Sequence, residues 1–193
     1  MAREILVFHV RLKEVTPAIW RRIEIRAEET FWGLHCAIQD AMPWKDKHLF
    51  QFRFPSGDEE LLIGLPTPKG VGEENLLWCW QTPLSDWYVT AAAQCHYLYD
   101  FGDRWIHTVT LEARRPAASR GGYPRCTAGQ RRCPPEDVGG PQGFSKFLEA
   151  LSEDLDRPEP RQRFVGSWNP EDFRPEDIVF TRSSTRLRRA GIR

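Results

Sequence analysis

Two stretches near the start of the chain alternate apolar and polar residues with the period of a β-strand. Residues 3–14 alternate in this way, which predicts a strand with at least one buried face. Thr16-Pro17 interrupts the pattern, and residues 19–25 then read as a second strand. Because the connection is short, the two strands are expected to pair antiparallel.

The period then changes to that of a helix. Thr30 is suited to cap a helix over residues 31–42, and Pro43 is suited to end it. The expected apolar stripe of this helix consists of Phe31, Leu34, Ile38 and Met42.

Further elements follow along the chain. Residues 48–54 are predicted as a strand, and residues 94–100 and 104–113 as two strands of a hairpin that turns at Phe101-Gly102. A short amphipathic helix is predicted over residues 143–153. Residues 55–75 are expected to form a long loop or a ragged hairpin, and residues 114–135 have the composition of a loop.

Strands and helices therefore occur in runs without β-α-β alternation. This order predicts the α+β class, with a mostly antiparallel sheet and a few short packed helices. The length of 193 residues fits a single domain, expected over residues 1–181, with a basic and flexible tail at 182–193.

The predicted hairpin carries the first candidate chemistry. A two-residue turn would place Asp100 opposite Asp103, and His96 opposite His107. Two facing carboxylates repel each other unless a cation lies between them or one is protonated, so Asp100 and Asp103 are candidate metal ligands or acid–base groups. The alternative is that both carboxylates accept backbone N–H groups of the turn. The histidines lie about 13 Å further along the strands, too far for one shared metal, so His107 would act separately as an acid–base group or be structural.

A second polar stretch precedes the predicted helix. Glu136 and Asp137 could join the hairpin carboxylates as ligands of magnesium or manganese, or could instead interact with the positive end of the helix dipole. Zinc at Cys126 and Cys133 is not favoured, because two further ligands are missing from the neighbouring sequence.

The charges are unevenly distributed, although the formal net charge is zero. Residues 114–133 contain no acid, so their arginines could contact phosphates of DNA or RNA, lie in solvated loops, or pair with acids elsewhere in the chain. These arginines are Arg114, Arg115, Arg120, Arg125, Arg131 and Arg132.

Several classes of protein are disfavoured. No apolar run is long enough to span a bilayer and no signal sequence is recognisable, so a cytoplasmic protein with reduced cysteines and no membrane partner is expected. The phosphate-binding P-loop, the dinucleotide-binding glycine motif, the HExxH zinc motif and the serine-hydrolase elbow are all absent from the sequence.

Two motifs carry a family resemblance. The hairpin motif, residues 97–107, reads Tyr-x-Tyr-Asp-Phe-Gly-Asp-x-Trp-x-His, and the loop motif, residues 126–140, reads Cys-x-x-Gly-x-x-x-Cys-Pro-Pro-Glu-Asp-x-Gly-Gly. Together they resemble the plasmid pRiA4b ORF-three-like family, also described as TnpR-like passenger proteins of bacterial insertion elements, over about residues 4–180. Val138 departs from the pattern, because family members often have cysteine there. Besides the candidate ligands and His107, the signature residues are Tyr99, Gly102, Trp105, Pro135, Gly139 and Gly140.

The resemblance implies a compact α+β domain encoded on plasmids or transposable elements, and it implies no resolvase activity. The leading hypothesis is a non-enzymatic accessory or binding protein, with a polar groove formed by the two motifs and a nucleic-acid or protein partner at the arginines. The alternative is a divalent-metal-dependent hydrolase of phosphodiesters. In that enzyme Asp100, Asp103, Glu136 and Asp137 would be ligands, and His107, Asp103 and Glu136 would be candidates for catalysis.

Overall fold

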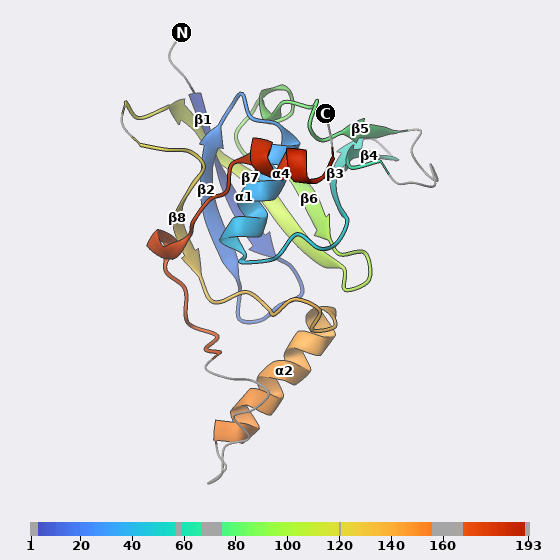
Figure 1. Cartoon of the computed structure of the whole chain (residues 1–193), viewed down its shortest axis with the longest axis vertical. Helices are drawn as coiled ribbons and strands as arrows, with labels where there is room; N and C mark the ends of the chain where they lie inside the picture. Colours follow the sequence, from blue (N-terminus) through green and yellow to red (C-terminus); the bar gives the residue numbers. More distant parts are fainter. Residues whose placement is uncertain (1–3, 57–58, 67–74, 120, 156–167, 192–193) are drawn as a thin grey trace.

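The computed structural model describes residues 4–56, 59–66, 75–119, 121–155 and 168–191. Eight strands form one sheet in the order β5-β4-β3-β6-β7-β1-β2-β8 (Figure 1). The strands are β1 (Glu4–Leu12), β2 (Trp20–Arg26), β3 (Phe50–Ser56), β4 (Glu59–Gly64), β5 (Leu76–Trp78), β6 (Gln94–Tyr99), β7 (Trp105–Pro116) and β8 (Arg125–Gln130). The helices are α1 (Phe31–Ala41), α2 (Gly140–Leu155) and α4 (Ser183–Arg189), with 3-10 turns η1 (Leu84–Asp86) and η2 (Pro175–Asp177).

The α+β class is confirmed, but the sheet is mixed. Strand β5 runs parallel to β4, whereas the other neighbouring pairs are antiparallel. Strand β4 forms a hairpin with β3, which is one of the two alternatives expected for residues 55–75. Strand β5, which was not predicted, then adds parallel to β4.

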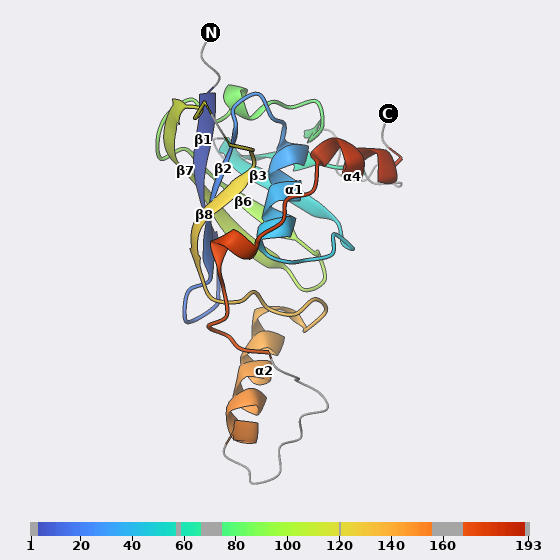
Figure 2. The ribbon, with the colours of Figure 1, turned by 60° about the vertical axis from the view of Figure 1, so that its left-hand side comes forward.

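The core lies between the sheet and α1. Helix α4 lies on the same side of the sheet as α1 (Figure 2). Alternate residues of β1, such as Phe8 and Val10, are fully buried in this core, as the alternation along the strand requires. Thr30 caps α1 as predicted, because its hydroxyl accepts the N–H of Gly33 at 3.5 Å.

Two parts of the chain differ from the sequence prediction. Residues 125–130 form β8, which pairs antiparallel with β2, although residues 114–135 were predicted as loop. Residues 183–189 form α4 instead of a frayed tail. Arg186 of α4 pairs with Asp40 of α1, and Ser183 accepts the indole N–H of Trp32 at 2.9 Å, so α4 is anchored on α1.

The predicted hairpin register is wrong by one residue. Tyr99 pairs with Trp105 and Tyr97 with His107, so the loop spans residues 100–104 and not Phe101-Gly102 alone. The shift changes which side chains of the two strands share a face, so His107 lies beside Tyr97 in the core and not opposite His96.

No helix in the described part of the chain combines the length and the apolar character that crossing a membrane would require.

Candidate functional site

The hairpin loop is organised by the side chain of Asp100. Asp100 and Arg104 both adopt positive φ angles, of 57° and 55°. One carboxylate oxygen of Asp100, Oδ1, accepts the N–H groups of Gly102 at 2.9 Å and Asp103 at 3.2 Å. This is the turn role that the sequence analysis named as the alternative for Asp100, and it leaves the second oxygen, Oδ2, outside the turn.

The loop motif packs directly against this hairpin. The carboxylate of Asp103 accepts the N–H of Gly139 at 3.0 Å. Gly140 has a φ of +69°, and a Cβ atom at this position would overlap the carbonyl oxygen of Asp103. The two motifs therefore meet in space, and the close approach requires glycine at position 140.

Glu136 anchors the loop motif to the aromatic layer beneath it. Its carboxylate accepts the Tyr99 hydroxyl at 2.5 Å and the backbone N–H of Lys45 at 2.8 Å. Burial, and then the hydrogen bond to Glu136, hold the pKa of Tyr99 well above its usual range. Trp44 stacks on Tyr99 and donates its indole N–H to the carbonyl of Pro134 at 3.0 Å. Glu136 thus has a structural set of partners.

The remaining carboxylates form a cluster with a histidine from the segment before β3. The Nε2 atom of His48 lies 2.8 Å from Oδ1 of Asp137 and 3.4 Å from Oδ2 of Asp100. One ligand atom from each of the three residues lies within 4.8 Å of the other two. We call His48, Asp100 and Asp137 the junction cluster.

The geometry of the junction cluster is compatible with a metal ion. Donor atoms bound to one ion at about 2.1 Å lie about 3.0–3.4 Å apart, which is close to the two separations from His48. Asp100 is buried and held by the turn, whereas Asp137 is 55% exposed and has a φ of +60°. The cluster is therefore accessible from solvent on the side of Asp137.

His48 was not among the residues predicted for the site. The register of β3 with β6 places Phe50 opposite Tyr99, and the N–H of Asp100 donates to the carbonyl of Leu49 at 2.9 Å. Pairing the predicted strand 48–54 with the first hairpin strand would have brought His48 to the loop. That pairing joins segments about fifty residues apart and is not encoded locally.

The structure does not bring His107 to the junction cluster. Its ring is fully buried between Trp44 and Tyr97, and Nδ1 lies 3.3 Å from the carbonyl oxygen of Tyr97. Burial lowers the pKa of His107 to about 4. An acid–base role at the carboxylates is therefore not supported for this residue, and Trp105 likewise lies in the buried layer, near Trp44.

The described arginines of residues 114–132 pair with acids from within the chain. Arg120 lies outside the described residues, and each of the other five arginines pairs with an acid from another segment. The pairs are Arg114 with Glu4, Arg115 and Arg125 with Glu24, Arg131 with Glu171, and Arg132 with Asp172. This arrangement is the internal pairing that the sequence analysis left open.

The two cysteines considered for zinc have separate surroundings. The thiol of Cys126 donates to the carbonyl of Ala128 at 3.3 Å. Cys133 is buried, and its Sγ lies 3.7 Å from a guanidinium nitrogen of Arg21. Burial raises the pKa of Cys133 to about 11, so this thiol stays protonated near neutral pH.

Comparison with known proteins supports the resemblance carried by the two motifs. The uncharacterized protein y4hQ of Sinorhizobium fredii is 35% identical over 153 residues, which cover 79% of this chain and 76% of that protein. The crystal structure of MM3350 from Methanosarcina mazei Go1, a protein of unknown function, superposes with a TM-score of 0.78. It is 33% identical and covers 93% of this chain and 100% of that chain. The model of the plasmid pRiA4b ORF-3-like protein family matches residues 4–180, and the chain belongs to this family.

Proposed function

We propose that this protein is a binding protein that holds a divalent metal ion at the junction cluster. The observation that carries the proposal is the convergence of His48, Asp100 and Asp137, from three separate segments, with ligand atoms within 4.8 Å of one another. The hydrogen bonds to Oδ1 of Asp100 also support the proposal, because they orient the carboxylate and do not involve Oδ2.

The donor set favours Mn²⁺ over Mg²⁺. Carboxylate oxygens suit both ions, but an imidazole nitrogen suits transition metals better than magnesium. Glu136 and Asp103, which the sequence analysis included as ligands, already accept hydrogen bonds from within the two motifs. We therefore assign them to the scaffold of the proposed site.

A metal-dependent hydrolase is the second candidate function. Three protein ligands leave coordination positions open for water and substrate, as in catalytic metal centres. Lys47 lies beside the cluster, with its Nζ atom 3.7 Å from Oδ2 of Asp137, and could attract an anionic substrate. These two features support hydrolysis of a phosphodiester. A metal-bound water would then supply the acid–base chemistry that the sequence suggested for His107.

Contact with nucleic acid has weaker support. The five described arginines of residues 114–132 already face carboxylates, which offset the attraction for a polyanion. The plasmid in the family's description supports an association with mobile DNA, without specifying contact with it.

Calorimetric titration of Mn²⁺ into chelator-treated protein tests the proposed function. The wild-type protein should bind one ion saturably, and His48→Gln and Asp137→Asn should each weaken binding at least about tenfold while remaining folded. Asp172→Asn, at an exposed acid outside the junction cluster, is the matched control and should bind as the wild type does. No saturable heat in the wild type, or equal binding by all variants, would contradict the proposal.

Hydrolysis of bis(p-nitrophenyl) phosphate with Mn²⁺ separates the two candidates. Turnover that disappears in His48→Gln would support the hydrolase. Metal binding without turnover would support the binding protein.

A further inference from the structure

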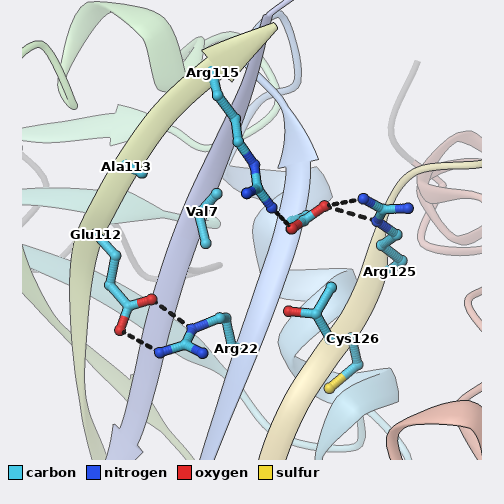
Figure 3. A pocket seen from close by; sticks show the side chains of 9 residues that line it. Val7, Arg22, Glu112, Ala113, Arg115, Arg125 and Cys126 are labelled. Carbon is cyan, nitrogen blue, oxygen red and sulfur yellow. Dashed lines mark hydrogen bonds and ion pairs between the residues drawn. The ribbon is translucent and has the colours of Figure 1, made fainter. Parts of the chain in front are cut away.

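A charged pocket lies on the face of the sheet that points away from α1. Arg22 and Glu24 of β2 alternate with the core residue Ile23, so their side chains lie on this opposite face. Together with residues of β1, β7 and β8 they line a pocket of about 780 Å³ (Figure 3). This volume is within the range of sites for small molecules.

Glu24 organises two arginines at one end of the pocket. Its carboxylate is 1% exposed and pairs with Arg115 from β7 and with Arg125 from β8, whose Nε lies 2.7 Å from Oε2. The two arginines, labelled in Figure 3, each pair with a different oxygen of the Glu24 carboxylate. Arg115 and Arg125 are 52% and 42% exposed, so each guanidinium also faces the solvent. The buried carboxylate thus holds two exposed cations in fixed positions.

Arg22 and Glu112 form a second ion pair in the same pocket. Arg22 donates from Nε and Nη2 to the two oxygens of Glu112, at 2.6 and 3.1 Å. This hydrogen bonding raises the pKa of Arg22 and lowers the pKa of Glu112, so both groups are charged at neutral pH. Three guanidinium groups and two carboxylates therefore line the pocket, which leaves an excess of one positive charge.

Two irregularities in the sheet border this pocket. The pairing of β1 with β7 shifts register between Val7 and Phe8, and the pairing of β2 with β8 shifts between Arg22 and Ile23. Bulges of this kind redirect side chains and are frequent beside functional sites. Val7 is 4% exposed and lines the pocket with Ala113, which adds an apolar surface next to the charges.

We propose that this pocket binds the phosphate group of a small phosphate monoester. Guanidinium groups match the geometry of phosphate oxygens, and the excess positive charge favours an anion. The apolar lining at Ala113, with Val7 beneath it, suits a non-polar group attached to the phosphate. The two carboxylates disfavour a nucleic-acid strand, whose successive phosphates would approach them. This site lies on β1, β2, β7 and β8 and does not depend on the junction cluster.

Calorimetric titration with phenyl phosphate at low ionic strength tests the proposal, with EDTA present to exclude binding through a metal. The wild-type protein should bind one molecule saturably, and phenol should not bind. Arg115→Gln and Arg125→Gln should each weaken binding at least about tenfold, because a charged hydrogen-bond donor is lost. Arg132→Gln, at an exposed arginine outside the pocket, is the control and should leave the affinity unchanged.

Glu112→Gln provides a test that misfolding cannot imitate. The change removes one negative charge and weakens the hold on Arg22, so phenyl phosphate should bind about threefold to tenfold more tightly. No saturable binding by the wild type, or unchanged affinity in Glu112→Gln, would overturn the proposal. So would an equal loss in Arg132→Gln, or binding of a single-stranded oligonucleotide in place of phenyl phosphate.

Discussion

Arg21 is the buried cation that ties the start of the loop motif to the core, and its replacement by methionine should destabilise the protein strongly. The side chain is 0% exposed and lies on the core face of β2. Its five N–H groups have five acceptors, which include the carbonyl of Ala41 at 2.8 Å and the thiol of Cys133 at 3.7 Å. The other acceptors are the carbonyls of Trp20, Gln130 and Arg131.

The magnitude follows from these contacts. Arg21→Met preserves most of the side-chain length but leaves four carbonyl groups without this donor. At about 1 kcal/mol for each unpaired carbonyl, the loss is about 4 kcal/mol. Part of this loss is offset because a buried charge no longer has to be desolvated, and burial already lowers the pKa of Arg21. We therefore expect the free energy of unfolding to fall by about 3 kcal/mol.

Urea unfolding at pH 7, followed by tryptophan fluorescence, measures this change. Arg11→Met is the matched control, because Arg11 is an exposed arginine on the neighbouring strand β1. The control should change the free energy of unfolding by less than about 0.5 kcal/mol. A loss in Arg21→Met no larger than that of the control would refute the argument that the guanidinium is the structural link.

Three further changes probe other parts of the structure. Burial lowers the pKa of His107 from 6.5 to about 4, so the unfolded chain binds a proton that the folded protein does not bind in this range. The free energy of unfolding should therefore fall by about 3 kcal/mol between pH 6.5 and 4. In His107→Leu, the free energy measured by urea unfolding should depend less steeply on pH, and the same pH dependence as in the wild type would contradict this origin. Gly140→Ala should lower the free energy of unfolding by about 2 kcal/mol, because position 140 has a positive φ and a Cβ there would overlap the hairpin. Gly122→Ala, where a Cβ would meet open space, is the control and should melt close to the wild-type temperature. Arg186→Gln should lower the free energy of unfolding by about 2 kcal/mol in the same urea assay, because the largely buried carboxylate of Asp40 would lose its cationic partner. A change below about 0.5 kcal/mol would count against the anchoring of α4.

Elements with a strong local pattern were predicted well. The helix at 31–41 has a cap, an apolar stripe and a proline close after its end, all within one stretch of sequence. The strands β1 and β2 have clear alternation and a short connection. Strand β8 was missed because its sequence, with Gly129 and without a regular apolar pattern, has little strand character of its own. It forms by hydrogen bonding to β2.

The hairpin shows how a local rule can mislead. Gly102 indicated a two-residue turn, but the positive φ angles occur at Asp100 and Arg104. Asp100 tolerates this conformation because its carboxylate accepts N–H groups of the loop, so five residues form the connection. The resulting register sends His107 into the core and leaves Asp100 beside His48.

Local sequence was enough to predict the class of fold, the main helix, most of the strands and the two motifs whose acids meet at the junction cluster. These features depend on periodicity, on caps and on residue types within short windows. Two contacts became visible only in the folded protein: His48 lies with Asp100 and Asp137, and Arg115 and Arg125 share Glu24. Both contacts join segments that lie about 40 to 100 residues apart, and such contacts depend on strand register and on packing, which no local pattern encodes.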